Sequence, residues 1–285
     1  MSFLLFCKSA GLLIDHIEIT GSRTKRVRTA CAPKQRKGWY RWDGKYGVCG
    51  VWHGAENGAQ NYKPGDDWQP PSVQEIARMD AARKRADAEL TRGHESAALL
   101  AQKMMREAVM MSHAYVSRKG FPALLTPCSA DGRYCYVPAW KNGTIRNVQM
   151  IDADPLAGKG KRFLPGGEMS GCYLAIGTQG RRVYCEGYAT GLSIAKSIKA
   201  MRLRAHVIVC FSANNLVAVS QALGDGVVVA DNDNLKSGDG EKWAKKTGLA
   251  YWMPSTDGDD ANDHARKFGV LDLSLNISKL LAIEC

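Results

Sequence analysis

The chain has 285 residues, of which 45% are hydrophobic and 24% are charged, the proportions of an ordinary soluble globular protein. Its formal net charge of +11 favours a polyanionic partner such as nucleic acid. The chain has no apolar run of about 18 residues and opens on too short an apolar stretch for a secretion signal, so we expect a cytoplasmic protein without a membrane partner.

Residues 1–68 are predicted to form a small, basic, β-rich unit. A short amphipathic helix is expected from Ser2 to about Gly11, followed by antiparallel strands that end near Gly65. Between residues 21 and 45, Lys and Arg residues interleave with aromatic residues. Cationic side chains neutralise phosphates and aromatic rings stack on unpaired bases, so nucleic-acid contact is expected here. The alternative is a solvated basic face over a small aromatic core. The residues expected to make this contact are Arg36, Lys37, Trp39 and Arg41.

The cysteines argue against a structural zinc site. There are nine, scattered along the chain and without a Cys-x-x-Cys pair, a pattern typical of reduced thiols in the cytosol. Zinc sites are recognised by paired ligands at short spacing, and only Cys31, Cys49 and His53, with Cys7, are candidates here. We therefore expect no zinc.

Residues 69–111 are predicted to form a helical linker. The segment VQEIARMDAARKRADAELTRG is rich in Ala, Glu and Arg and is typical of a solvated helix. We expect Gly93 to interrupt this helix. The segment that follows has a more apolar face, and there we expect Leu99, Leu100 and the nearby methionines to belong to a core.

Residues 112–178 are predicted to form a basic subdomain of strands and turns. KNGT indicates a β-hairpin between YVPAW and IRNVQMI. The loop LAGKGKRFLPGG places cations among glycines, and such a loop is suited to hold a triphosphate or a template backbone. The alternative is a mobile, solvated loop. The candidate phosphate-binding residues of this subdomain are Arg118, Lys119, Arg146, Lys159, Lys161 and Arg162.

Residues 179–285 contain three acidic clusters, each placed just after a short apolar run. The runs VYC, GVVVA and LAYWM are predicted to be buried parallel strands, with helices between them. In such sheets ligands bind beyond the carboxyl ends of the strands, and all three clusters fall on that edge. The candidate metal ligands there are Glu186, Asp231, Asp233, Asp260 and Asp263.

Carboxylates gathered at one edge repel each other and raise one another's pKa. A hard divalent cation removes that cost, and a site made only of carboxylate oxygens suits Mg²⁺ or Mn²⁺. The alternative interpretation makes Glu186 a neighbour of a helix N-cap and places Asp231 and Asp233 in an Asx turn. Three such clusters in succession favour the metal site.

These acids carry a resemblance to a known family. The Glu186–Gly187 pair, Asp231-x-Asp233 and the late Asp260-x-Asn-Asp263 resemble the signature of the Toprim domain, which primases, topoisomerases and some nucleases share. CFSANNLVAVSQAL, and upstream HAYVSRKGFP with the strand-rich segment after it, are similar to Toprim primases of phages and plasmids. The resemblance covers about residues 112–269.

The resemblance implies an α/β fold. Its C-terminal part, residues 179–285, would be a Toprim-like Rossmannoid parallel sheet flanked by helices. A mixed α+β basic subdomain would precede it, and a long helix would join that subdomain to the N-terminal β-rich unit.

The resemblance also implies a DNA primase activity, a nucleotidyltransferase that acts on single-stranded DNA and nucleoside triphosphates with Mg²⁺ or Mn²⁺. Asp231, Asp233 and Glu186 would be catalytic, with Glu186 either a ligand or a general base, and Lys236 would reach phosphate. No Gly-x₄-Gly-Lys-Ser/Thr motif is present, so a separate replicative helicase is expected in a bacterial or phage-infected cell. The alternatives are a Toprim nuclease and a non-catalytic nucleic-acid-binding protein.

Overall fold

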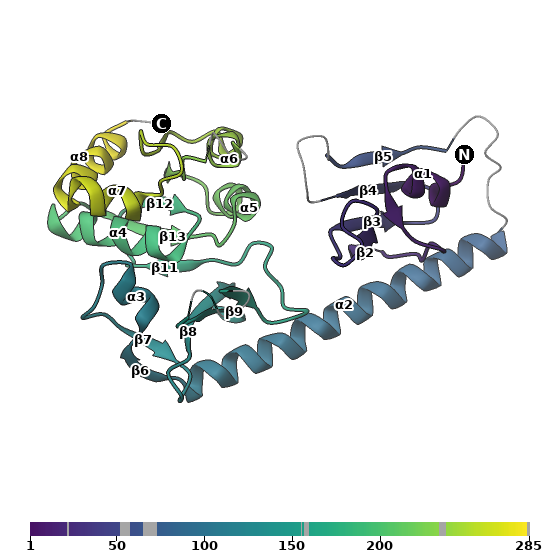
Figure 1. Cartoon of the computed structure of the whole chain (residues 1–285), viewed down its shortest axis with the longest axis horizontal. Helices are drawn as coiled ribbons and strands as arrows, with labels where there is room; N and C mark the ends of the chain where they lie inside the picture. Colours follow the sequence, from purple (N-terminus) through teal and green to yellow (C-terminus); the bar gives the residue numbers. More distant parts are fainter. Residues whose placement is uncertain are drawn as a thin grey trace. The chain divides into compact units, whose positions relative to one another are not determined.

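A computed structural model of the chain describes residues 1–21, 23–51, 58–64, 73–154, 156, 160–233 and 238–283. They fall into two units, residues 1–93 and residues 94–285, each with its own hydrophobic core (Figure 1). The predicted domain boundaries after residues 68, 111 and 178 stay predictions.

The first unit is built on one antiparallel sheet. Its elements are α1 (Phe3–Ser9), β1 (Leu12–Leu13), β2 (Lys25–Thr29), β3 (Gly38–Trp42), β4 (Gly47–Val51) and β5 (Gln60–Tyr62), with the strands in sequence order across the sheet. Helix α1 is the short amphipathic helix expected from the sequence, and its Phe3 and Cys7 are buried. The Phe3 ring stacks on Trp42 at 4.6 Å and meets the edge of Tyr40 at 6.1 Å. These two aromatic residues of the basic stretch therefore belong to the core of this unit.

Helix α2 (Val73–Glu107) runs through Gly93 without a break, so the predicted interruption is wrong. One glycine costs a helix only about 1 kcal/mol relative to alanine, and the flanking residues are strong helix formers. Leu99 and Leu100 are 66% and 48% exposed, which makes the prediction of core positions wrong for both. Ala97 and Ala101, four residues apart, are buried instead, because small side chains let a sheet approach the helix closely.

Within the second unit, the first sheet is antiparallel. Its elements are β6 (Val109–Ser112), α3 (Ala114–Arg118), β7 (Leu125–Cys128), β8 (Tyr134–Lys141), β9 (Thr144–Asp152) and β10 (Lys161–Phe163), with strand order β10-β9-β8-β7-β6. The hairpin predicted at KNGT joins β8 to β9. Asn142 and Gly143 both have positive φ angles, 50° and 74°, as a two-residue hairpin turn requires.

The C-terminal sheet is mixed, with strand order β11-β13-β12-β14-β15. Strands β12 to β15 are parallel to one another, as predicted, but the edge strand β11 is antiparallel to β13. Figure 1 shows α4, α7 and α8 on one face of this sheet and α5 and α6 on the other. The strands are β11 (Leu174–Ile176), β12 (Arg181–Cys185), β13 (Ala205–Val209), β14 (Val227–Val229) and β15 (Tyr251–Trp252). The helices are α4 (Tyr188–Ala200), α5 (Ala213–Leu223), α6 (Asp239–Thr247), α7 (Ala261–Phe268) and α8 (Val270–Leu281).

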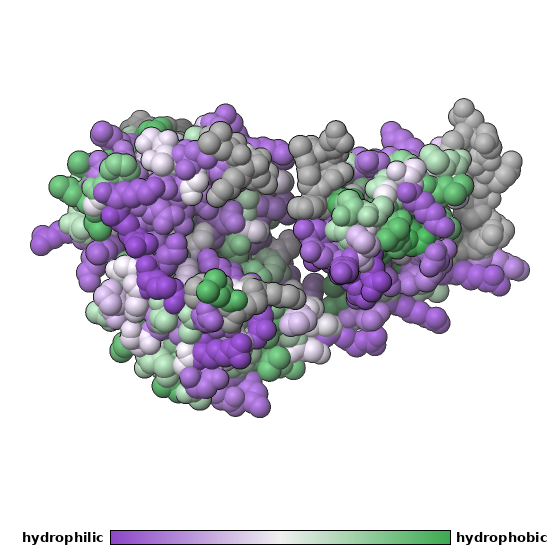
Figure 2. All heavy atoms as spheres, in the orientation of Figure 1, coloured by the Kyte–Doolittle hydropathy of each residue, from purple (hydrophilic) through white to green (hydrophobic). Residues whose placement is uncertain are grey.

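The apolar residues of the sequence are mostly used inside these layers. On the face shown in Figure 2, hydrophilic side chains predominate and apolar ones form small groups between them. Among the described residues, no helix combines the length and the apolar character that crossing a membrane would require.

Asn215 links the segment that enters β11 to the end of β13. Its buried side chain accepts a hydrogen bond from the Gly171 amide (2.7 Å) and donates to the carbonyls of Cys172 and Cys210 (both 2.7 Å). Gly171 and Cys172 lie just before β11, and Cys210 directly follows β13. One amide side chain thus satisfies three backbone groups that would otherwise be buried without partners.

Replacing Asn215 with Ala should lower the free energy of unfolding by about 2–4 kcal/mol, because it leaves buried backbone groups unpaired. Urea denaturation of the full chain measures this change. The matched control is Asn276→Ala, which removes a surface amide that contacts Asp272 (3.0 Å) and should change stability by less than about 0.5 kcal/mol. Equal effects of the two changes would contradict the linking role of Asn215.

Candidate active site

Two neighbouring strands bring the first two acids together. Glu186 directly follows β12, and Asp231 follows β14 after Ala230. The strands are parallel neighbours in which Val183 pairs with Val227. Their carboxyl ends therefore lie side by side, and the two acids emerge at the same edge of the sheet.

Asp231 is an acid of this edge with a strongly raised pKa. Burial raises its pKa from the ordinary 3.8 to about 7, and the negative charges of Glu186, Asp260 and Asp233 add to the effect, while Lys161 opposes it. Its Oδ1 atom is buried and has no hydrogen-bond partner within the described residues. A buried carboxylate oxygen without a partner is costly, so this position suits a group that the described residues do not supply.

The loop after β14 is fixed by its own contacts. Asp233 Oδ1 accepts a hydrogen bond from the Gly240 amide (2.8 Å), and the Asn232 amide donates to the carbonyl of Asp259 (3.0 Å). A side chain at position 240 would place its Cβ 2.0 Å from the Asp231 carbonyl oxygen. Gly240 is therefore required for this close approach, which keeps α6 against the acidic loop.

Asp260 and Asp263 come from the third acidic cluster. Asp260 is the N-cap of α7, and its Oδ1 accepts a hydrogen bond from the Asp263 amide (2.9 Å). The Asp263 carboxylate lies 3.8 Å from the ammonium group of Lys119. Asp260 is thus a helix cap whose charge also acts on Asp231. Asp263 connects the acids to Lys119, the residue that follows α3.

This donor set fits one hard divalent cation. Within the part of the chain that the structure describes, no three His, Cys, Asp or Glu side chains converge as a preformed metal-binding group. A Mg²⁺ site needs only one or two carboxylates, because water and substrate phosphates complete its shell. Such an ion would bind the Asp231 oxygen that has no partner among the described residues, and it would reduce the repulsion between Asp231 and the neighbouring carboxylates. The wider ligand set of five acids stays a prediction.

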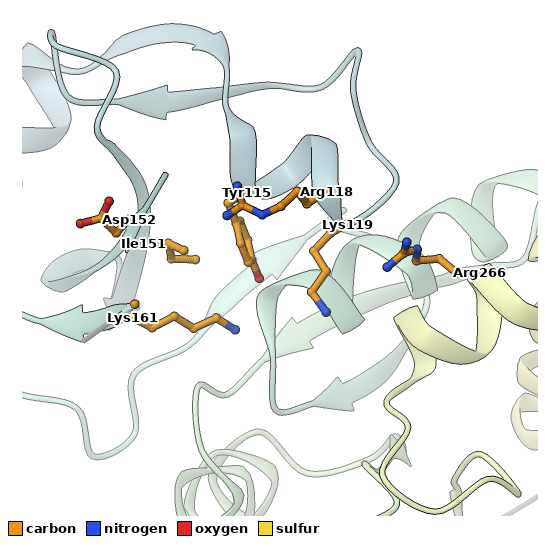
Figure 3. Close-up of a pocket in the computed structure, with 8 residues that line it drawn as sticks. Tyr115, Arg118, Lys119, Ile151, Asp152, Lys161 and Arg266 are labelled. Atoms are coloured by element: carbon orange, nitrogen blue, oxygen red, sulfur yellow. The ribbon is translucent and has the colours of Figure 1, made fainter. Parts of the chain in front are cut away.

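A basic pocket adjoins the acids. It has a volume of about 290 Å³, and its lining includes four cationic residues, Arg118, Lys119, Lys161 and Arg266. In Figure 3 Lys119, Lys161 and Arg266 extend toward one another from the end of α3, from β10 and from α7. Arg118 runs beside Tyr115 instead and donates to the Ala153 carbonyl (2.7 Å). The structure thus brings together three of the predicted phosphate-binding residues and adds Arg266.

Lys161 joins this pocket to the acidic edge. Burial lowers its pKa and the charge of Lys119 lowers it further, while Asp260, Asp231 and Glu186 raise it. The Lys161 ammonium group interacts with three carboxylates and with another lysine, so it lies between the acidic edge and the cations of the pocket. A ligand with both phosphate oxygens and a bound cation matches this arrangement.

Other predicted residues lie elsewhere. Arg146 is held in ion pairs with Glu95 (2.7 Å) and Glu168 (2.9 Å), which raise its pKa and make it a structural link. The Arg162 guanidinium lies over the ring of Tyr134, 4.8 Å from its centroid. Lys159 and Lys236 fall outside the described residues.

The predicted residues of the first unit lie on its own sheet and the turn before β3. Arg36 is exposed in that turn and Lys37 is half-buried, while Arg41 is exposed on β3 and donates from Nε to Thr24 Oγ1 (2.8 Å). The Trp39 ring covers Gly50, where an added Cβ would lie 3.0 Å from it. Nucleic-acid binding by these residues stays a prediction.

The zinc candidates are not gathered in the described part of the chain. Cys49 is buried in the core and accompanies Cys7, whose pKa it raises through a hydrogen bond between the thiols. Cys31 is exposed, and His53 falls outside the described residues. The expected absence of zinc stays a prediction.

Sequence reasoning missed Arg266 and the role of Tyr115, which also lines the basic pocket. Arg266 lies on α7, in the helix that Asp260 begins, and only the tertiary approach of α7 to α3 and β10 reveals its place. Tyr115 is close in sequence to the predicted phosphate-binding residues Arg118 and Lys119. Its position near these cations was the one sequence feature that could have indicated a role in binding.

Comparison with models of protein families finds a Toprim domain over residues 181–270. This range contains Glu186, Asp231, Asp233, Asp260 and Asp263, and it confirms the part of the resemblance that concerns Toprim. Toprim domains occur in enzymes that act on nucleic acids, among them primases, nucleases and topoisomerases, and they bind Mg²⁺ through acidic residues. The chain is thus a mixed α/β protein with a C-terminal Toprim domain.

Replacing Asp231 with Asn should stabilise the metal-free protein at pH 8. The folded pKa of Asp231 lies above its unfolded value, so the native state binds more protons between about pH 4 and 7. The free energy of unfolding should therefore fall by about 2–4 kcal/mol across this window, since one pKa unit corresponds to about 1.4 kcal/mol. Urea denaturation in the presence of EDTA, at a series of pH values, measures the free energy of unfolding of the wild-type protein and of the Asp231→Asn variant. The variant should lose this part of the pH dependence, and an unchanged profile would contradict the burial of an ionisable carboxylate.

Proposed function

We propose that this Toprim-containing chain is a primase-like nucleotidyltransferase that joins nucleotides on a single-stranded DNA template. The observation that carries the proposal is the position of Lys161, which lines the basic pocket and feels the charges of Asp231 and Glu186. Phosphoryl transfer uses both kinds of group, cations for the phosphates and carboxylates for a hard divalent ion.

Under this proposal the acids hold Mg²⁺, and Mn²⁺ has the same ligand preference. Asp231 supplies an oxygen that has no hydrogen-bond partner among the described residues, and Glu186 lies beside it at the neighbouring strand end. Asp233, Asp260 and Asp263 keep the loop and α7 in place around them. When bound, the ion would lower the pKa of the attacking 3′ hydroxyl and neutralise charge on the leaving pyrophosphate.

The cations of the pocket receive the triphosphate of the incoming nucleotide. In the reaction the 3′ oxygen of the primer forms a bond to the α-phosphorus, and the bond from that phosphorus to the bridging oxygen breaks. Pyrophosphate leaves with the electron pair, and Lys119 and Lys161 balance its charge. The proton of the attacking hydroxyl passes to a carboxylate of the acidic edge or to solvent water.

A Toprim nuclease would use the same acids to hydrolyse a phosphodiester. A recessed pocket of about 290 Å³ that holds four cationic residues favours the triphosphate of a free nucleotide over a continuous nucleic-acid backbone, which needs an open track. A non-catalytic binding protein would gain nothing from a destabilised carboxylate such as Asp231, because nucleic-acid binding alone needs only cations and aromatic rings.

The partners belong to the proposal as well. They are the single-stranded template, nucleoside triphosphates and a separate replicative helicase, and the proposed location is the cytoplasm of a bacterial or phage-infected cell. The net charge of +11 supports a nucleic-acid partner.

The direct test incubates the full chain with single-stranded DNA, a labelled nucleotide and Mg²⁺. Labelled products longer than one nucleotide show synthesis, and shortened DNA shows cleavage. Asp231→Ala should lower primer synthesis at least about a hundredfold, because it removes a carboxylate on which the cation site depends. Its far-UV circular dichroism should match that of the wild-type protein, because the change leaves the strands and helices intact.

The control variant is Glu107→Gln, which alters an acid near the end of α2 that pairs only loosely with Lys103 (3.9 Å). Synthesis should persist in it. If Asp231→Ala retains synthesis with normal metal dependence, the assignment of the acidic edge is wrong. If the wild-type protein shortens DNA and makes no longer product, the nuclease is the correct activity.

A further inference from the structure

Tyr115 lies at the wall of the basic pocket. It belongs to α3, which begins after the N-cap His113, and only 6% of its surface is exposed. The ammonium group of Lys161 lies over the ring, 5.3 Å from its centroid. In Figure 3 the hydroxyl end of the ring points toward the ammonium groups of Lys161 and Lys119.

The Tyr115 hydroxyl is buried beside the Ala189 backbone amide, and no described residue accepts the proton of this hydroxyl. Burial is also the main reason that its pKa is raised above the ordinary value of 10.0, so the hydroxyl keeps its proton near neutral pH. A buried hydroxyl without a partner is unfavourable by about 1–3 kcal/mol relative to one that is bonded. Buried tyrosine hydroxyls usually find a partner, so this one requires an explanation.

Among the described residues, the pocket side of this hydroxyl offers mainly donors. The Asp260 carboxylate is close enough to raise the pKa of Tyr115, but its Oδ1 accepts from the Asp263 amide (2.9 Å) and the Tyr115 hydroxyl makes no hydrogen bond to it. The four cationic residues of the pocket are all donors, and lysine and arginine side chains cannot accept a hydrogen bond. The carboxylate of Asp152 also lines the pocket, but it accepts from Arg133 Nε (3.3 Å) and from the Asp154 amide (3.1 Å). With no acceptor bonded to it among the described residues, the hydroxyl is suited to a ligand that brings an acceptor.

The ligand that satisfies all of these groups at once is an oxyanion. A phosphate group carries several strong acceptor oxygens, and its negative charge matches the ammonium groups of Lys119 and Lys161. A neutral ligand would accept the hydrogen bond of the hydroxyl but would leave the positive charges of the pocket without a counter-charge. The Asp152 carboxylate, which lines the pocket, already has its own partners.

We propose that the Tyr115 hydroxyl is a substrate-binding group that donates a hydrogen bond to a phosphate oxygen held between Lys119 and Lys161. The identity of the ligand as a nucleoside triphosphate rests on the proposed function, whereas its phosphate chemistry does not. In the absence of ligand the hydroxyl destabilises the protein, and binding relieves that cost. Tyr115 thereby ties nucleotide binding to the packing of α3.

The test compares two Tyr→Phe variants of the full chain. Tyr115→Phe removes a hydroxyl whose proton no described residue accepts. Tyr184→Phe removes one that donates to the Gly224 carbonyl at 2.8 Å, before the start of β14 and so at the opposite end of that strand from Asp231. Without ligand, Tyr115→Phe should have an equal or higher thermal midpoint than the wild-type protein. Tyr184→Phe should have a lower one, because it leaves a buried carbonyl with fewer partners.

Binding is then measured for two probes that carry the same phosphate chemistry, a fluorescent ribonucleoside triphosphate and a labelled single-stranded DNA. Tyr115→Phe should weaken binding of the triphosphate about tenfold or more and leave DNA binding within about twofold, since a hydrogen bond to a charged group is lost. Tyr184→Phe should bind both probes as the wild-type protein does.

The opposite results are equally definite. The proposal is overturned if Tyr115→Phe binds the triphosphate as tightly as the wild-type protein does. It is also overturned if the wild-type protein does not bind the triphosphate. A loss confined to DNA would assign the hydroxyl to a backbone phosphate and overturn its role with the nucleotide. If triphosphate binding falls as expected but the wild-type protein makes no primers, the substrate contact stands and the proposed function fails.

Discussion

The repulsion among carboxylates at the carboxyl edge of the C-terminal sheet is the interaction on which the rest of the second unit depends. Asp231 is half-buried, with its Oδ1 atom shielded from solvent, and the charges of Glu186, Asp260 and Asp233 act on it while Lys161 offsets them. Water would screen the same acids on an open surface, but burial makes their interaction strong. The edge is therefore stable only with partners, which come from the first sheet and, in the proposed function, from a cation and a substrate.

The contacts between the two sheets follow from this requirement. Asn262, buried at the start of α7, donates to the Lys119 carbonyl (2.8 Å) and to Ser193 Oγ (2.9 Å), so it fastens the end of α3 to α4 and α7. Asn215 makes a comparable connection in the C-terminal sheet, between the segment before β11 and the residue after β13. Both are neutral amides that satisfy buried backbone groups, and they hold the cations in place without adding charge to the site.

Much of the fold was readable from the sequence. Short β-branched runs such as Val227–Val229 mark buried parallel strands, and the acids after them mark the carboxyl edge, because strand polarity fixes which end faces the ligand. The Asn142–Gly143 turn was predictable since few residues adopt two successive positive φ angles. These features depend on local conformation, which neighbouring residues largely determine.

What the sequence did not reveal depends on contacts between distant segments. Arg146 belongs to a basic segment, but Glu95 and Glu168 neutralise it, and neither is close to it in sequence. Arg266 joins the pocket only because α7 packs near α3 and β10. Gly93 did not break α2, since helix propensity is a weak preference that a long run of helix formers overrides. The unpartnered hydroxyl of Tyr115 is likewise a property of burial, which composition does not show.

The central claim is that the half-buried acids form a cation site, and that their mutual repulsion in the free protein raises the pKa of Asp231. Calorimetric titration of the full chain with Mg²⁺ at pH 7, in buffers of different ionisation enthalpy, measures the protons released on binding. Because the pKa of Asp231 is about 7, the wild-type protein should release about half a proton and the Asp231→Asn variant almost none. Binding without proton release in the wild-type protein, or equal release in the variant, would contradict the account.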